Sequence, residues 1–336
     1  MSKVTVFVGL DYATSFVQVC VLDRDGRQQG NRRCENDVSA IASYVRQFGD
    51  RAVAAVETCT GAANLAERLN EIPGWHVDLA HAGYVKRLKQ SPDKTDYSDA
   101  RLLAELQCVG YLPKVWLASE FTRELRKVVH YRQTVANQRR DCKLRIRAIL
   151  RDHRVTLPEA TPWTKAWCVW LQHVQLPVAS RWIVDRHLVD LQLVEERLKE
   201  AAKQLEQMVT DDMLTDELRK QPGIGLLTAC MLRAEIGRFD RFNSGKQLAR
   251  YCGLTPRNAS SGERQADAGL IKAGDPQLRA MLIEAAHRLT RTDPRWKDFK
   301  MRLADNGKKP PVIAAAVANR WIRGLYHRMK ELRPAA

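Results

Sequence analysis

The first 112 residues alternate between segments typical of strands and segments typical of helices, and this alternation restricts the fold more than any other feature. Two strand-like runs, VTVFVGL and FVQVCVLD, come first and are joined by a short loop. Helical periodicity and strand-like runs then take turns, at residues 39–49, 51–57, 64–72, 75–80 and 96–110. A hairpin followed by this alternation predicts an α/β domain in which helices flank one sheet.

Four acidic residues occupy positions that such a fold would bring together. The segment order suits a ribonuclease-H-like sheet, in which the first strand lies centrally beside a later parallel strand. Asp11 follows the first strand, and Glu57 ends a later one. Asp96 and Asp99 are three residues apart, which places both on one face of a helix's first turn. Each acid alone has an ordinary reading as a turn residue, a strand-end surface acid or a helix cap.

Together these acids favour a metal site over four ordinary roles. Gathered carboxylates repel one another unless a cation lies among them. Hard oxygen ligands suit Mg²⁺ or Mn²⁺, and two such ions can stabilise the attacking and leaving oxygens of a phosphodiester displacement. The expected metal ligands are Asp11, Glu57, Asp96 and Asp99. A basic protein with such a site would act on DNA or RNA.

Residues 113–214 form the second expected region, which is helical and basic. Between residues 114 and 154 the chain carries twelve Lys or Arg against four acids, along a helical apolar stripe. A second long helix, from about 179 to 209, repeats apolar residues at the spacing of a coiled-coil seam. The two predict a helical hairpin. Its charge favours phosphate contacts over a merely solvated face, and the residues expected to make them are Arg139, Arg140, Lys143 and Arg147.

Residues 215–336 form the third expected region, mostly helical with glycine-rich connectors. The turn PGIG, at 222–225, precedes a helix and resembles the hairpin of a helix-hairpin-helix element. In such an element the backbone amides around Gly223 and Gly225 and the helix N-terminus would hold a phosphate. A plain turn between two helices is an equally good reading.

A loop in this third region places two serines before a glycine. The stretch GLTPRNASSGER, residues 253–264, has the small residues of a tight loop, with Ser260 and Ser261 directly before Gly262. Ser-Gly pairs are common in turns, so the local pattern alone does not indicate catalysis. Basic residues in and after the loop are candidates for phosphate contacts, namely Arg257, Arg264 and Lys272.

The charge of the chain favours a polyanionic partner. The formal net charge is +16, from 55 basic and 39 acidic residues, and the pI is about 9.7. A merely basic soluble protein would share this composition. The eight cysteines include no CxxC, so neither a zinc motif nor disulfides are indicated. No apolar stretch suits a membrane helix and the N-terminus has no cleavable signal pattern, so we expect a cytoplasmic protein with no membrane partner.

Several blocks, taken in order, resemble the DEDD transposases of insertion elements. They are GLD at 9–11, VETCTG at 56–61, KTDYSDARLLAEL at 94–106, PGIG at 222–225, the loop GLTPRNASSG, and KAGDPQLRAML at 272–282. The resemblance covers almost the whole chain. It implies a RuvC-like N-terminal domain, a coiled-coil middle and a mostly helical C-terminal transposase domain.

The resemblance also implies a chemistry and partners. It places the family's four acids on Asp11, Glu57, Asp96 and Asp99, and its nucleophilic serine on Ser261. The serine hydroxyl would attack a DNA phosphodiester, giving a phosphoserine link and a free 3′-hydroxyl, while the acids hold Mg²⁺. A structured bridge RNA would pair with donor and target DNA. A homodimer would pair into a tetramer, in which the acids of one subunit meet the serine of another.

Three other readings compete with this one. A metal-only junction nuclease would use the same acids with water as its nucleophile. An actin-like sugar kinase or ATPase would need a glycine-rich phosphate loop beside the first strand, which LDYATSF does not offer. An inactive relative would bind RNA without cutting DNA, although all four acids and the serine are present.

Overall fold

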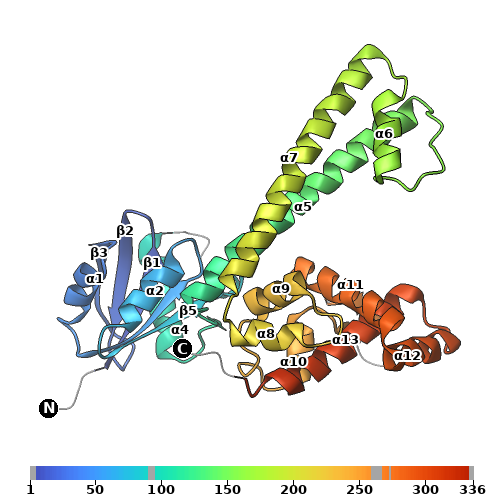
Figure 1. Ribbon diagram of the computed structural model, residues 1–336. Coiled ribbons are helices and arrows are strands. Elements are labelled where there is room, and N and C mark those ends of the chain that lie inside the picture. Colours follow the sequence, from blue (N-terminus) through green and yellow to red (C-terminus); the bar gives the residue numbers. More distant parts are fainter. Residues whose placement is uncertain (1–4, 90–94, 259–266, 272–273, 333–336) are drawn as a thin grey trace. The chain divides into compact units, whose positions relative to one another are not determined.

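A computed structural model describes residues 5–89, 95–258, 267–271 and 274–332 (Figure 1). The chain divides into two compact units, residues 1–119 and 120–336. The first unit is α/β and the second mostly helical, which confirms the predicted fold class. The expected boundary at 214/215 stays a prediction, because both helical regions fall within the second unit. In the part of the chain that the structure describes, no helix has the length and apolar character needed to cross a membrane.

A single six-stranded sheet forms the centre of the first unit, in the order β3-β2-β1-β4-β5-β6. Its strands are β1 (Thr5–Tyr12), β2 (Phe16–Leu22), β3 (Gln28–Glu35), β4 (Arg51–Glu57), β5 (Trp75–Ala80) and β6 (Lys114–Val115). The first three strands pair antiparallel, β4 and β5 run parallel to β1, and β6 is antiparallel to β5. As expected, β1 lies centrally with the parallel β4 beside it.

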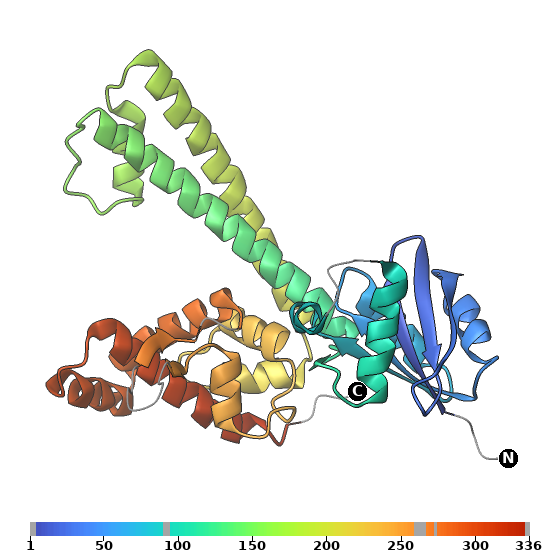
Figure 2. The same ribbon diagram turned by 180° about the vertical axis from the view of Figure 1, so that it is seen from behind.

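Helices cover both faces of this sheet (Figures 1 and 2). They are α1 (Val38–Val45), α2 (Ala62–Asn70), α3 (Ala82–Leu88) and α4 (Asp96–Cys108). α1 and α2 pack against alternate strand residues such as Val8 and Val19. α4 lies on the opposite face, where Ala100 packs against Cys20. Successive strand residues point to opposite faces, so the sheet is buried on both sides.

The edge strand β3 is an element that the sequence analysis does not predict. Its sequence, QQGNRRCE, is polar, and only Cys34 in it is buried. It forms because β2 offers it an antiparallel ladder along almost its whole length. Charged side chains on an edge strand also discourage pairing with other chains. This strand carries Arg33, which forms an ion pair with Asp96.

The second unit begins with the predicted helical hairpin. α5 (Glu120–Asp152) and α7 (Val178–Met208) lie side by side, and α6 (Lys165–His173) packs at their distant end (Figures 1 and 2). Two separate apolar clusters lie along the seam, one with Val135, Val194 and Leu198, the other with Ile146, Leu150, Trp167, Leu171 and Val184.

The rest of the second unit is a helical domain with one short hairpin. Its elements are α8 (Met213–Arg219), α9 (Leu226–Ile236), α10 (Gly245–Tyr251), β7 (Pro256–Asn258), β8 (Asp267–Leu270), α11 (Pro276–Thr292), α12 (Pro294–Asp305) and α13 (Pro310–Met329). Its core includes Leu125 and Val129 of α5, and Leu205 of α7. The base of the long hairpin is therefore part of this core.

Candidate functional site

The carboxyl ends of β1 and β4 place Asp11 and Glu57 side by side. The parallel register pairs Leu10 with Val56, so the two acids are the next residues on neighbouring strands. Paired residues of adjacent strands project from the same face of a sheet. Burial, with added contributions from the Glu57 and Asp11 carboxylates, raises the pKa of the Cys59 thiol beyond β4. Both carboxylates are therefore close enough to Cys59 to affect the same thiol.

α4 crosses this face in close contact with β1 because Gly9 has no side chain. A Cβ atom at Gly9 would overlap the carbonyl oxygen of Ala100. Gly9 and Asp11 are two residues apart on the strand, so Asp11 also faces α4. Cys108 is the last residue of α4, and its thiol lies 4.0 Å from the carbonyl oxygen of Asp23. Asp23 follows the end of β2, and this end of β2 pairs with the start of β1. The first turn of α4 therefore lies toward the end of β1 that carries Asp11.

A capping box fixes where α4 begins. The Thr95 hydroxyl accepts a hydrogen bond from the Ser98 amide at 3.1 Å, and the Ser98 hydroxyl accepts one from the Thr95 amide at 3.3 Å. Asp96, the first helical residue, forms an ion pair with Arg33 of β3 at 3.0 Å. The helix start is thus held both by its own capping side chains and by the edge strand.

Asp99 lies deeper than the other acids. Its exposed fraction is 9%, and the ammonium of Lys89 forms an ion pair with it. Its buried Oδ1 atom is the oxygen that the Lys89 ammonium contacts. A buried charge is costly unless an opposite charge pairs with it, so Asp99 depends on a cationic partner at this position.

The four expected acids thus lie at one end of one face of the sheet. The groups that surround them differ between the strand acids and the helix acids. Asp11 and Glu57 are neighbours across β1 and β4, whereas Asp96 and Asp99 each face a basic side chain. Among the described residues these acids form no group of three whose ligand atoms lie within 4.8 Å of one another. The all-oxygen donor set fits Mg²⁺ or Mn²⁺, which would replace the two basic partners.

The expected nucleophile lies outside the described residues. Ser261, its neighbour Ser260 and Arg264 belong to 259–266, and Lys272 also falls outside the described part of the chain. The structure does describe the flanking strands, since β7 and β8 pair antiparallel and carry the loop between them. Arg257 is exposed on β7.

The other expected contact residues fall on two further elements. The PGIG turn joins α8 to α9, with Gly223 at φ 80° and Gly225 at the N-cap of α9. In the long hairpin, Arg140 and Arg147 are exposed, while the ammonium of Lys143 lies 4.9 Å from the ring centroid of Trp163. Arg139 is half-buried beside them. None of these positions identifies a ligand by itself.

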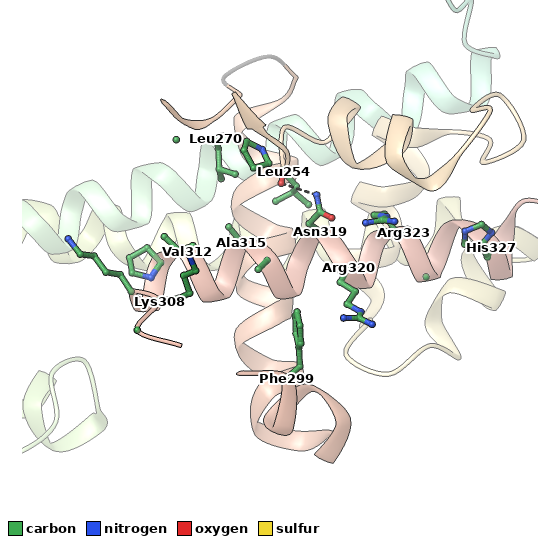
Figure 3. Close-up of a pocket in the computed structure, with 17 residues that line it drawn as sticks. Leu254, Leu270, Phe299, Lys308, Val312, Ala315, Asn319, Arg320, Arg323 and His327 are labelled. Carbon is green, nitrogen blue, oxygen red and sulfur yellow. Dashed lines mark hydrogen bonds between the residues drawn. The ribbon is translucent and has the colours of Figure 1, made fainter. Parts of the chain in front are cut away.

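A groove that the sequence analysis does not predict lies beside the β7–β8 hairpin (Figure 3). It has a volume of about 1100 Å³ and runs between that hairpin, the end of α12 and α13. Leu254 and Leu270 form part of one wall, and Phe299 lies across from them. Asn319 of α13 donates a hydrogen bond to the carbonyl oxygen of Leu254 at 3.1 Å, which ties α13 to the segment before β7.

The charged side chains of this groove are all basic. Its described lining contains no Asp or Glu, and its basic residues are Lys308, Lys309, Arg320, Arg323 and His327. The guanidinium carbon of Arg320 lies 5.0 Å from the Phe299 ring centroid. The basic C-terminal helix in the sequence is the one signal that points to this surface. The groove suits a ligand that combines negative charge with flat apolar groups.

Comparison with known proteins gives two family matches. Residues 8–154 match the DEDD transposase model of the IS110 type, and residues 215–300 match the model described as transposase IS116/IS110/IS902 family. The transposase for insertion sequence element IS1328 of Yersinia enterocolitica is 24% identical over 81% of each chain. The transposase for element IS1111A of Coxiella burnetii is 25% identical over 93% of this chain and 86% of its own. A probable family 20 transposase of Pseudomonas aeruginosa is 26% identical over 95% of both.

Removal of the α4 cap tests how the acids are positioned. We expect Thr95→Ala to destabilise the first turn by about 1 kcal/mol, because the Ser98 amide loses its acceptor. Hydrogen exchange of the amides at 98–100 should then be about fivefold less protected. Thr95→Ser keeps the acceptor and serves as the control, with near-normal protection. Equal protection in all three proteins would show that the cap does not hold this turn.

Proposed function

The chain belongs to the IS110/IS116/IS902 family of transposases, and from this premise we propose that it cuts and rejoins DNA through a covalent bond to Ser261. Both family matches confirm the resemblance that the sequence motifs carry. A transposase is an enzyme that processes DNA, and its DEDD domain implies a divalent metal ion. The serine intermediate, the identity of the metal ligands and the guide RNA are the parts that we propose.

The observation that carries the proposal is the clustering of four acids at one end of the sheet. Asp11 and Glu57 end adjacent parallel strands, and α4 brings its first turn to the same end. We propose that Asp11, Glu57, Asp96 and Asp99 hold Mg²⁺ or Mn²⁺. When bound, such an ion would stabilise the negative charge that develops on a reacting phosphate. Arg33 and Lys89 keep the acids neutralised until then.

The proposed reaction is a transesterification at phosphorus. The Ser261 hydroxyl loses its proton as its oxygen forms a bond to the phosphorus atom, and the bond from phosphorus to the 3′-oxygen breaks. One DNA end remains joined to the serine, and the other leaves with a 3′-hydroxyl. Rejoining is the reverse step with the 3′-hydroxyl of another strand. Because a serine hydroxyl is a weak nucleophile, this step needs activation, which we assign to the acid site.

We propose that the basic groove holds one strand of the nucleic acid next to the serine loop. The groove borders the β7–β8 hairpin that carries residues 259–266. Arg320 and Arg323 offer charge to phosphates, and Phe299 offers an aromatic face to an unstacked base. Arg257 on the same hairpin would extend this surface. The basic face of α5 and the PGIG turn, with Gly223 and Gly225, would contact further phosphates.

Guidance by RNA and assembly are also proposals, which rest on the family resemblance and the charge of the chain. The net charge of +16 suits a protein that binds a structured RNA together with donor and target DNA. The acids belong to the first unit and Ser261 to the second. A dimer that pairs into a tetramer would let the acids of one subunit meet the serine of another.

Ser261→Ala separates the proposed reaction from a metal-only junction nuclease. We expect this variant to form no covalent protein–DNA adduct and no recombinant product, because the attacking oxygen is missing. Adducts are measured on denaturing gels with labelled element-end DNA, and Ser260→Ala is the matched control, which should react. Cleavage at the normal rate by Ser261→Ala would instead support water as the nucleophile.

Neutralising one acid should abolish cleavage without loss of RNA binding. We expect Asp11→Asn and Asp99→Asn each to lower strand cleavage by about 100-fold or more, since each removes a charged ligand at nearly constant shape. RNA affinity, measured by gel shift, should stay within about twofold, because we expect these acids to bind metal and not nucleic acid directly. Asp25→Asn, in an exposed turn, is the control. A parallel loss of RNA binding would contradict the metal-ligand role.

Charge removal from the groove should weaken DNA binding in a salt-dependent way. We expect the double variant Arg320→Gln/Arg323→Gln to reduce the slope of log affinity against log salt by about 2, one unit for each lost phosphate contact. Lys297→Gln/Lys300→Gln on α12 removes the same charge outside the groove lining and is the control. Equal slopes for both double variants would mean that overall charge, and not the groove, sets the affinity.

A further inference from the structure

A group of potential metal ligands lies in the long hairpin, far in sequence from the DEDD acids. It consists of Cys142 on α5 and of His187 and Asp190 on α7. Their sulfur, nitrogen and oxygen ligand atoms all lie within 4.8 Å of one another. His187 and Asp190 are three residues apart and share one helix face, which points to α5. The sequence offers no sign of the group, because its members are separated by 45 residues and form no short motif.

This group lies between the two apolar clusters of the hairpin. On α5, Cys142 falls between Val135 of one apolar cluster and Ile146 of the other. On α7, His187 falls between Val184 of the second cluster and Val194 of the first. A thiol, an imidazole and a carboxylate thus lie between the two apolar clusters, next to Leu188 and the buried Leu191 of α7.

Two of these side chains are largely buried, and the third reaches solvent. Cys142 is 7% exposed and the imidazole of His187 16%, whereas the Asp190 side chain is 57% exposed. The Nδ1 atom of His187 is buried and has no hydrogen-bond partner among the described residues. Its nearest acid oxygen is Oδ2 of Asp190, at 3.6 Å. That separation is too long for a hydrogen bond, so the buried nitrogen remains unsatisfied unless a further group lies between the two atoms.

We propose that Cys142, His187 and Asp190 bind Zn²⁺. Bonds of about 2.0 Å from a tetrahedral zinc ion put its nitrogen and oxygen ligands about 3.3 Å apart, close to the observed 3.6 Å. A mixed sulfur, nitrogen and oxygen set prefers zinc to the hard ions suited to the DEDD acids. Binding releases the Cys142 proton to solvent, so the two negative ligands balance the ion's charge.

The fourth ligand of this ion is water. A cavity of about 300 Å³ beside the group is lined by Cys142 and Asp190, and its other lining residues include Asp141, Arg145 and Arg197. This cavity gives solvent access to the ion. The zinc ion joins α5 to α7 between the two apolar clusters, so it fixes the register of the two helices. This role is independent of the proposed serine chemistry.

The second group of this kind, His130, Glu235 and Asp275, does not carry the same inference. Glu235 already pairs with His130 at 2.8 Å and with the guanidinium of Arg126 at 3.6 Å. Asp275 caps α11 by accepting a hydrogen bond from the Gln277 amide. Its ligands are therefore satisfied without a cation, in contrast to the Nδ1 atom of His187.

Cobalt substitution of the full-length protein tests the zinc site. We expect one Co²⁺ per chain to give the visible bands of a tetrahedral ion and a sulfur-to-cobalt charge-transfer band, which only a bound thiolate produces. Zn²⁺ should remove these bands at one equivalent. Cys142→Ala should abolish the charge-transfer band, and His187→Ala should lower cobalt affinity by at least about tenfold.

Cys59→Ser is the matched control, because Cys59 lies beside Asp11 and Glu57 and would report metal bound there. The band must persist in this variant. A band that disappears with Cys59→Ser, or the absence of any thiolate band in the wild-type protein, would overturn the proposal. Because Cys142→Ala introduces a small apolar side chain, circular dichroism without metal should match the wild type. Zn²⁺ should raise the melting temperature of the wild type but not of Cys142→Ala.

Discussion

The backbone contact between β1 and α4 at Gly9 is the constraint on which the acidic end of the first unit depends. Because Gly9 has no side chain, the backbones of β1 and α4 come into direct contact there, which fixes the position of the helix along the strand. That contact sets the first turn of α4 beside the ends of β1 and β4. Asp11 and Asp99, far apart in sequence, are gathered by packing elsewhere in the domain, because carboxylates do not attract one another.

Electrostatics then determines what this gathering allows. Arg33 comes from the polar edge strand and Lys89 from the segment after α3, so each helix acid has a basic partner from a different element. These ion pairs offset the repulsion between the helix acids, and a divalent ion bound as proposed would exchange for charges that the chain itself supplies. Such an exchange would couple the positions of Arg33 and Lys89 to the state of the acids.

Hydropathy and segment order predict the buried strands, α4 and the long hairpin, since these elements owe their stability to apolar burial. They do not predict β3, whose QQGNRRCE sequence pairs through its backbone alone. The positions of Asp11 and Glu57 follow from strand order, but the partners of Asp96 and Asp99 do not, because they depend on side chains from distant segments. The proposed role of Ser261 rests on family motifs, and the groove and the Cys142 group arise only from tertiary packing.

The long hairpin has a consequence of scale. α5 has 33 residues, which at about 1.5 Å per residue is a rod of roughly 50 Å. Its base belongs to the core around α9, so the rod does not pivot independently of the domain that bears the serine loop. Duplex DNA rises about 3.4 Å per base pair, so the rod matches roughly fifteen base pairs. If a nucleic acid contacts both ends of the rod, as the proposed contacts on α5 require, the hairpin would set the spacing of those contacts without reading a base.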